Sequence, residues 1–365
     1  MRLKAQGELT RGPDFRLLAD LDVDVDGVAA LVGASGAGKS SLLRLISGFE
    51  PHATVTVEVD GERWQAADRT GSAVPAHRRA VGTVFQESRL FPHCTARGNL
   101  EFAGRSRRPG VKLAFDEVVH VLDLEPLLGQ YPHELSGGQR QRVALGRTLL
   151  APAKLWLFDE PMSALDPASR REIAPYLYDL CRRHAVPIVY VSHSLPEVLA
   201  IADQVWIASA GSVTAVDSLP AFSTALDHPL MSDDQAGAVI ACRFKSFDAR
   251  YGLSELVFAD APLFVPGDLS AVGGPILLHI PARDVSLSTT AIDQVSILNR
   301  VAGTVDAIVQ DGEAALVRVG CGEQSLLARV TRRSVDELRL EPGTRVLALI
   351  KSVAVRTTAE LGPQP

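Results

Sequence analysis

Residues 33–40 run Gly33-Ala34-Ser35-Gly36-Ala37-Gly38-Lys39-Ser40 and match the pattern G-x-x-x-x-G-K-S/T. The apolar run Val28 to Val32 precedes them, and the helix-like stretch Ser41 to Ser47 follows. Glycines let backbone N–H groups close on phosphate oxygens, and the positive end of the following helix points at the same oxygens. In this pattern the lysine reaches the terminal phosphates and the serine hydroxyl can hold Mg2+. The segment therefore predicts a strand, a phosphate-binding loop and a helix that together bind ATP or GTP.

A second strand-like run ends in two carboxylates. Leu155 to Phe158 are apolar, and Asp159 and Glu160 follow directly. This order is typical of a buried parallel strand whose carboxyl end faces the phosphate loop. We expect Asp159 to hold Mg2+, directly or through water, and Glu160 to orient or deprotonate the water that attacks the terminal phosphate. The alternative is a solvated strand end without a catalytic role.

His193 follows a third strand-like run, Val186 to Val191. Ligands of open α/β sheets bind at the carboxyl ends of the strands, so this imidazole is expected beside the two carboxylates. We expect His193 to sense the terminal phosphate. The alternative is a purely structural histidine.

The segment Leu135-Ser136-Gly137-Gly138-Gln139 precedes a helix with an apolar side. A Ser-Gly-Gly helix start offers bare backbone donors and a hydroxyl, and is therefore a second anion site. One nucleotide does not need two such sites from one chain. We therefore expect this segment to serve the nucleotide held by the phosphate loop of a second copy. A plain helix cap is the alternative.

In their order along the chain, these motifs resemble those of the ATP-binding subunit of an ABC transporter, over roughly residues 1–230. The resemblance implies that Gln86, in the run Val84-Phe85-Gln86, contacts Mg2+ and the attacking water, and that His193 takes the switch position. The run Ser163 to Asp166 is similar to the D-loop, which lies across the dimer interface in that family. Phe15 is the candidate for stacking on adenine, with a core phenylalanine as the equal alternative.

Three sets of site residues follow from the motifs and the resemblance. The predicted catalytic residues are Glu160, Gln86 and His193, and the predicted Mg2+ ligands are Ser40, Gln86 and Asp159. The predicted nucleotide-binding residues are Phe15, Gly33, Ala34, Ser35, Gly36, Ala37, Gly38, Lys39, Ser40, Ser41, Ser136, Gly137, Gly138, Gln139 and Asp166.

Length and composition bound the remaining possibilities. A chain of 365 residues with 46% hydrophobic residues is long enough for two or three domains with real cores. Its net charge of -6 argues against nucleic-acid binding, because no basic block interrupts the chain. The four cysteines are far apart and predict neither disulfides nor a zinc site. The chain shows neither a leader pattern nor a run of about 18 apolar residues. We therefore expect a peripheral protein at the cytoplasmic side of the membrane, with the membrane-spanning segments supplied by a partner.

Within the first 230 residues, an antiparallel layer is expected against the parallel core. Val55, Val57 and Val59 alternate with polar residues, and Asp60-Gly61 is a hairpin-type turn.

A helical insertion, including Phe115 to Leu128, is expected between Gln86 and Leu135. The ABC resemblance implies that this subdomain docks onto a transmembrane permease, with the stretch Arg89 to His93 supplying much of the contact. Its apolar residues could equally pack in a loop core, but exposed apolar loop residues are better explained by a partner.

Composition shifts after Pro229, and helical periodicity nearly disappears from there. One short helix is expected near Ser334 to Leu338. Strand-like runs follow one another at Gly303–Val309, Ala314–Val319, Ser325–Val330 and Arg345–Ile350, with turns at Asp311-Gly312 and Pro342-Gly343. These features predict a small β-barrel, most like an OB-type module.

Parts of this barrel region resemble the molybdate-binding domain at the end of molybdate importer ATPases. The matching runs are residues 296–300, 303–305, 334–338 and 348–355, and residues 280–287 resemble the strand that leads into that domain. Ser, Thr, Lys and backbone N–H groups suit a tetrahedral oxyanion. The pair Arg332-Arg333 departs from the neutral polar residues often found there, and a purely structural barrel is the alternative.

The sequence thus predicts an α/β P-loop NTPase of the ABC type, with an antiparallel β layer and a helical subdomain, followed by a small all-β OB-like barrel. The predicted domains are residues 1–230, with the helical subdomain at about 87–150, a linker and β segment at 231–290, and an oxyanion-binding domain at 291–360. The resemblance implies a homodimeric subunit that hydrolyses ATP to drive molybdate uptake through a permease, served indirectly by a substrate-binding protein.

Three other functions compete with this one, and of these an oxyanion sensor or storage protein is disfavoured by the complete hydrolytic motifs. The near alternative is an importer ATPase for tungstate, sulfate, iron, a sugar or a polyamine. A soluble ABC ATPase that acts on DNA or the ribosome is disfavoured, because the chain has neither a long coiled-coil insertion nor a duplicated ATPase.

Overall fold

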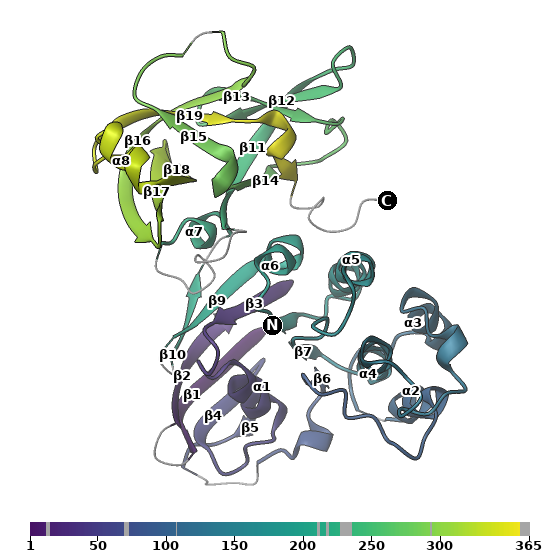
Figure 1. Cartoon of the computed structure of the whole chain (residues 1–365). Helices are drawn as coiled ribbons and strands as arrows, with labels where there is room; N and C mark the ends of the chain where they lie inside the picture. The colour runs from purple at the N-terminus through teal and green to yellow at the C-terminus, as the bar shows by residue number, and fades with distance from the viewer. Residues whose placement is uncertain are drawn as a thin grey trace. The chain divides into compact units, whose positions relative to one another are not determined.

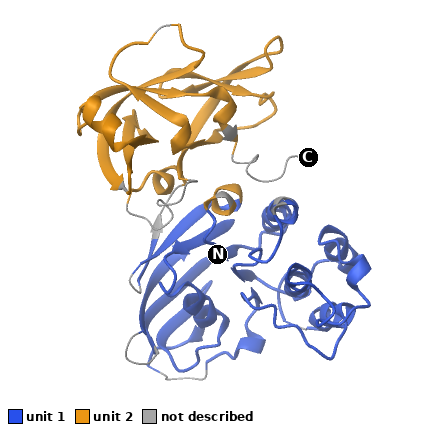
Figure 2. Cartoon of the chain, viewed as in Figure 1, with its two compact units in different colours: residues 1–194, 201–216 blue, residues 195–200, 217–365 orange. Residues whose placement is uncertain are grey.

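The computed structural model describes residues 1–11, 15–68, 73–106, 108–209, 212–216, 219–226, 236–292 and 294–357. The chain forms two compact units, coloured blue and orange in Figure 2. The first unit comprises residues 1–194 and 201–216, and the second comprises residues 195–200 and 217–365. The domain boundary expected near residue 230 and the domain end expected at residue 360 lie outside the described residues, so these limits stay a prediction.

The first unit is built on a six-stranded, mostly parallel sheet (Figure 1). Its strands, in order across the sheet, are β10 (Ser212–Val216), β9 (Gln204–Ser209), β3 (Val28–Gly33), β8 (Ile188–Val191), β7 (Leu155–Asp159) and β6 (Val81–Val84). Neighbouring strands run parallel, except that β10 pairs antiparallel with β9 at one edge. The central strands β3, β8 and β7 are buried along their whole length, which explains their continuous apolar runs.

A four-stranded antiparallel sheet forms the second layer of this unit. Its order is β2 (Phe15–Asp24), β1 (Arg2–Arg11), β4 (Thr54–Val59) and β5 (Glu62–Gln65). The buried valines of β4 share a hydrophobic core with α1 (Lys39–Ser47) and with β3 and β7 of the parallel sheet. The hairpin expected at Asp60-Gly61 is confirmed: the two residues have φ of 49° and 79°, as a two-residue type I′ turn requires.

The helical insertion expected after Gln86 is also confirmed. The remaining helices of residues 1–201 are η1 (Ala76–Arg78), α2 (Ala96–Gly104), α3 (Phe115–Val121), η2 (Glu125–Leu127), α4 (Gly137–Leu150), α5 (Pro167–His184) and α6 (Leu195–Ile201). The stretch Phe115 to Leu128 is not one helix, because Asp123 takes a left-handed φ of 49° between α3 and η2. Among the described residues, no helix is both long enough and apolar enough to cross a membrane.

The second unit contains two five-stranded antiparallel sheets. The first has the order β13 (Ala261–Pro266), β12 (Leu253–Phe258), β11 (Gly237–Asp248), β14 (Ile276–Pro281) and β20 (Arg356–Thr357). The second has the order β15 (Val285–Ser288), β19 (Arg345–Ile350), β16 (Asn299–Asp311), β17 (Ala314–Cys321) and β18 (Gln324–Thr331). Short helices at residues 219–357 are α7 (Leu219–Ser223), η3 (Ala282–Asp284), α8 (Arg332–Glu337) and η4 (Ser352–Ala354).

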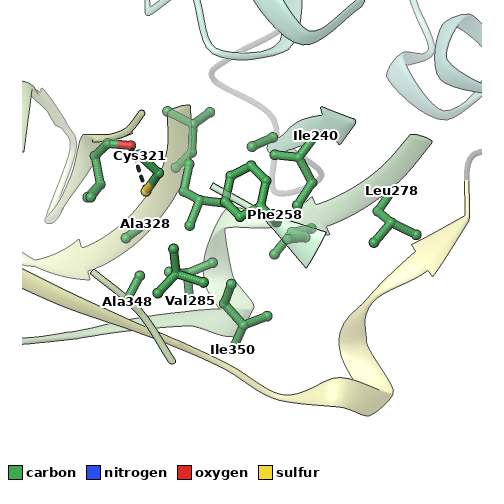
Figure 3. Close-up of a cluster of buried hydrophobic side chains, with 14 of the residues drawn as sticks. Ile240, Phe258, Leu278, Val285, Cys321, Ala328, Ala348 and Ile350 are labelled. Carbon is green, nitrogen blue, oxygen red and sulfur yellow. Dashed lines mark hydrogen bonds between the residues drawn. The ribbon is translucent and has the colours of Figure 1, made fainter. Parts of the chain in front are cut away.

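One hydrophobic core joins both sheets of the second unit (Figure 3). Ile240 and Phe258 from the first sheet and Ala348 and Ile350 from the second belong to it, each at most 1% exposed. The strands expected within residues 303–350 and the short helix beside them are confirmed. The predicted scheme separates the β segment before residue 290 from the barrel, whereas the structure packs both on the same core, because each sheet has an apolar face that the other covers.

Candidate nucleotide site

Five segments that lie far apart in the sequence line one cavity of about 380 Å³ in the first unit. The lining consists of Phe15, Gly33, Ser35, Gly36, Gly38, Lys39, Ser40, Ser41, Gln86, Glu160 and His193. The cavity lies beyond the carboxyl ends of β3, β6, β7 and β8, where ligands of parallel sheets bind. The structure therefore brings together all three predicted catalytic residues, Phe15 and most of the predicted phosphate loop. Ala34 and Ala37 belong to the loop but do not line the cavity.

The loop between β3 and α1 has the geometry of an anion cradle. Gly36 and Gly38 have φ of 81° and 98°, a backbone region that residues with a Cβ rarely adopt. A Cβ on Gly38 would lie 2.9 Å from Leu17 Cδ1, so the Leu17 side chain would have to shift to admit it. Gly38 caps α1 without any side-chain hydrogen bond, which leaves the N-terminal end of the helix to an anion.

Lys39 is held over the loop by two carbonyl groups. Its Nζ donates hydrogen bonds to Gly33 O at 2.7 Å and to Ala34 O at 2.9 Å. Burial lowers the pKa of this ammonium group, and the carboxylates of Glu160 and Asp159 oppose that shift. A phosphate would replace neutral carbonyls by full negative charges, so Lys39 has a stronger partner available once a nucleotide binds.

Asp159, the last residue of β7, is 6% exposed. Burial raises the pKa of this carboxyl group above its usual range, while a hydrogen bond with the Ser40 hydroxyl acts in the opposite direction. Ser40 lies in the first turn of α1, so strand β7 and helix α1 bring two oxygen ligands together. Magnesium prefers oxygen ligands of this kind, and the position fits the predicted metal site.

Glu160 follows β7 with a left-handed φ of 49°, which is uncommon for a residue with a side chain. Its N–H donates to Val191 O at 3.1 Å, and its carbonyl accepts from Gln141 Nε2 and from Ser163 Oγ, each at 3.0 Å. Its carboxylate Oε1 lies 3.3 Å from Nδ1 of His193. This backbone conformation lets the carboxylate meet His193 in the cavity, as expected from the carboxyl ends of β7 and β8.

The segment 136–139 does not line the cavity of its own chain. Ser136 is the N-cap of α4 and forms a capping box with Gln139, whose backbone N–H donates to Ser136 Oγ at 3.2 Å. The Gln139 side-chain Oε1 in turn accepts from Ser136 N at 2.8 Å. Gly138 packs tightly, because a Cβ there would lie 2.9 Å from Ala164 O. Within one chain these residues start a helix, and their role toward a nucleotide stays a prediction.

Asp166 is likewise a helix cap in this structure. It precedes α5, and its carboxylate accepts from the N–H groups of Ala168 and Ser169, both at 3.0 Å, and from Ser169 Oγ at 2.6 Å. These hydrogen bonds lower the pKa of the Asp166 carboxyl to about 2. Asp166 does not line the cavity, so its predicted contact across a dimer interface also stays a prediction.

A second cavity, of about 990 Å³, is lined by parts of the parallel sheet and of the helical insertion. Arg89 and Phe91, from the predicted docking stretch, line it together with Phe49 and Phe102. The rings of Phe91 and Phe102 meet edge to face at 4.8 Å, and Phe102 is still 59% exposed. Sequence reasoning missed Phe49 and Phe102, because an isolated aromatic residue in a chain gives no sign of its exposure.

In the second unit, several polar residues in or beside the runs that resemble the molybdate-binding domain make bonds within the chain. Asn299 is fully buried, and its side chain bonds the backbone N–H and carbonyl of Phe264 at 2.6 and 3.0 Å and the Ser352 hydroxyl at 3.2 Å. Ser334 bonds to Thr331, the N-cap of α8. Arg333 pairs with Glu337 at 2.7 Å. The structure therefore explains Asn299 as a link between β13, β16 and η4.

Two protein families match this chain. The ABC transporter family matches residues 19–163, and the TOBE domain family matches residues 295–357. A solved structure of a dimeric bacterial ABC transporter cassette, MJ0796, aligns with a TM-score of 0.49 and 25% identity over 58% of this chain and 95% of that chain. The family match, the sheet order and the cavity together define an ABC-type ATPase.

Two curated relatives are similar over nearly the whole length. The molybdenum import ATP-binding protein ModC of Albidiferax ferrireducens is 42% identical, with 94% of this chain and 93% of the relative covered. The protein of the same name from Thiobacillus denitrificans is 43% identical, with 94% and 95% covered. The chain belongs to the family of molybdenum import ATP-binding proteins.

Proposed function

We propose that this chain is the ATP-hydrolysing subunit of an ABC importer that drives molybdate uptake. The observation that carries this proposal is the 42–43% identity to molybdenum import ATP-binding proteins, which extends through the second unit. The ATPase motifs alone leave the solute open. The cavity described above supplies the chemistry that such a subunit needs.

In the proposed complex, the loop 33–41 binds the phosphates of ATP through its backbone N–H groups and Lys39, and Phe15 stacks on the adenine. The phosphate loop and Phe15 line the same cavity, so one nucleotide can contact the loop and the ring at once. Mg2+ fits the oxygen groups of Ser40, Asp159 and Gln86, which would hold it. When bound, Mg2+ supplies charge neutralisation for the phosphates.

Hydrolysis uses the residues at the carboxyl ends of the strands. Glu160 orients or deprotonates the attacking water, and Gln86 helps to hold that water. His193 senses the terminal phosphate through the ring that lies 3.3 Å from Glu160. The terminal phosphate can reach this pair, because the His193 side chain is 67% exposed.

Two copies would close on two ATP molecules. The Ser136–Gln139 segment and Asp166 do not line the cavity of their own chain, so the proposal assigns them to the nucleotide of the partner copy. The proposed complex then attaches to a membrane permease through the 990 Å³ groove, whose exposed rings Phe49 and Phe102 offer apolar surface to a protein partner. The subunit would lie at the cytoplasmic side of the membrane, with a substrate-binding protein acting on the other side.

The TOBE match covers the region proposed to bind molybdate, residues 295–357. Backbone N–H groups, Ser, Thr and Lys351 are the groups that would hold the oxyanion there. Because Asn299 and Ser352 are bonded to each other, a bound anion would need other donors from this region.

Tracer uptake in cells that lack this chain tests the proposal. Restoring the chain should restore molybdate uptake and leave sulfate uptake unchanged, and the Glu160→Gln variant should not restore molybdate uptake. Equal recovery of both solutes, or recovery of sulfate alone, would assign the importer to another oxyanion.

A further inference from the structure

Gln141 is a buried polar residue. It lies in α4, two positions after Gln139, and is 4% exposed. Burying an amide is unfavourable unless it is hydrogen-bonded. Its Nε2 donates to the backbone carbonyl of Glu160 at 3.0 Å. This bond connects the helix that starts with the Ser-Gly-Gly segment directly to the residue that carries the catalytic carboxylate.

The backbone of Glu160 needs such support. A left-handed conformation of a non-glycine residue persists only where the surroundings hold it. Gln141 and Ser163 both donate to the Glu160 carbonyl, and the Glu160 N–H donates to Val191 O. The bonds act on the peptide groups on both sides of the Glu160 Cα, so they determine the direction in which the side chain leaves the backbone.

Ser163, the other residue that donates to this carbonyl, belongs to the loop that packs on the start of α4. Ser163 precedes Ala164, and a Cβ on Gly138 would lie only 2.9 Å from Ala164 O. Helix α4 and the loop 163–166 therefore hold Glu160 from two sides. Ser163 donates through its hydroxyl at 3.0 Å and through its backbone N–H at 3.2 Å, and of the two side-chain donors only Gln141 is buried.

We propose that Gln141 is a positioning residue for ATP hydrolysis. It fixes the Glu160 carboxylate where it meets His193 and the attacking water, and it does not itself touch the nucleotide. This inference rests on the proposed role of Glu160 in hydrolysis.

Gln141→Met tests this inference in the full chain, since methionine has a similar length and no donor. Val143→Ala is the control: Val143 is fully buried in the same helix and has no polar side-chain atom. We expect Gln141→Met to lower kcat about 10- to 100-fold with KM for MgATP within about twofold, as a misplaced catalytic group would. Val143→Ala should lower Tm and keep kcat within about twofold of wild type. A kcat of Gln141→Met within twofold of wild type would overturn the inference.

Gln141→Glu gives a readout that a merely structural role would not produce. Only the protonated carboxyl can donate to the Glu160 carbonyl, and burial favours that form. The kcat of this variant relative to wild type should therefore rise as the pH is lowered, and a flat ratio contradicts the inference.

Glu160→Gln separates the inference from the function on which it rests. If Glu160→Gln loses hydrolysis while Gln141→Met keeps it, the inference alone is wrong. If Glu160→Gln hydrolyses at the wild-type rate, the proposed role of Glu160 is wrong as well.

Discussion

Oε1 of Glu160 lies 3.3 Å from Nδ1 of His193, and the two residues follow the neighbouring parallel strands β7 and β8. Pairing of these strands places their carboxyl ends side by side, so an acid and an imidazole that are distant in sequence become partners. The left-handed φ of Glu160 completes the arrangement. The pair is accessible to solvent at the cavity where the terminal phosphate of ATP is proposed to bind.

Glu160→Gln should lower kcat for ATP about 10²- to 10⁴-fold, the usual contribution of a general base, while MgATP still binds. Because the product forms slowly, the proposed dimer should accumulate. Light scattering of the variant with saturating MgATP measures its mass. A chain that stays monomeric under these conditions contradicts the two-copy arrangement.

Asp159→Asn should stabilise the nucleotide-free chain by about 1 kcal/mol. The substitution removes a buried negative charge, which serves the proposed metal site at a cost in folding stability. The pKa of Asp159 is higher in the folded chain than in the unfolded one, so burying its charge costs stability at pH values above that pKa. The gain from the substitution should therefore be greatest near neutral pH and shrink as the pH falls through the folded pKa. Thermal unfolding at several pH values measures this gain.

The same variant should lose the rise in Tm that MgATP gives to the wild type, because the ligand no longer binds the folded state tightly. Asp20→Asn, at an exposed position on β2, is the control and should change stability by no more than about 0.5 kcal/mol. An unchanged response of Asp159→Asn to MgATP would remove Asp159 from the metal site.

Arg79 should be a major source of stability in the first unit. It is 1% exposed, and its Nη1 donates to Leu45 O at 2.9 Å and Ile46 O at 2.7 Å at the end of α1, while its Nε donates to Val74 O at 2.9 Å. Burial lowers the pKa of Arg79 to about 10, so it remains charged at neutral pH. Arg79→Met should lower the free energy of unfolding by about 3 kcal/mol, because buried carbonyls lose their donors.

Urea unfolding followed by tryptophan fluorescence measures this loss, since Trp64, Trp156 and Trp206 all lie in the first unit. Arg78→Met is the matched control, because Arg78 is exposed, and it should change stability by no more than about 0.5 kcal/mol. Equal effects of the two substitutions would refute the role of Arg79.

Phe102→Asp should block transport without blocking catalysis. Its ring is exposed at the groove proposed for the permease, and a carboxylate there disfavours an apolar contact. ATPase activity of the purified chain should stay within about twofold of wild type, because Phe102 lies outside the nucleotide cavity. Molybdate uptake by complemented cells should be lost. Normal molybdate uptake by the variant would mean that the permease docks on another surface of the chain.

One of the four cysteines should react rapidly with Ellman's reagent at neutral pH. Cys94 is partly exposed, whereas Cys181, Cys242 and Cys321 are buried. Burial raises the pKa of these three thiols to about 11, 12 and 12, so the reactive thiolate is nearly absent until the pH approaches those values. Cys94→Ser should abolish the fast phase, and the other three thiols should react after unfolding. Fast labelling of a second thiol would contradict the burial.

The nucleotide cavity could be anticipated to a large extent from the chain. The phosphate loop is a local pattern, and the rule that ligands bind at the carboxyl ends of parallel strands places Glu160 and His193 beside it. Gln141 could not be anticipated in this way. Its neighbours Arg140 and Arg142 make the segment look like a polar helix surface, and its burial arises from packing against residues distant in sequence.

In the second unit, too, local features could be predicted from the sequence, whereas long-range packing could not. Alternating apolar residues and Asp-Gly or Pro-Gly turns predict most strands after residue 300, because these signals are local. Residues 237–288 and the later strands pack in one hydrophobic core. This packing depends on which apolar faces of the sheets cover each other, and the pattern within one strand does not reveal which face packs against it.

The order of residues alone thus establishes the phosphate loop, the strand ends with their acids, and the two-part organisation, because backbone geometry and apolar periodicity act over a few residues. Three-dimensional packing sets the hydrogen bonds that hold Glu160, the burial of Gln141 and Arg79, and the exposed groove beside Phe102. Those features arise from contacts between residues far apart in the chain, and their free energies depend on burial that no short segment possesses.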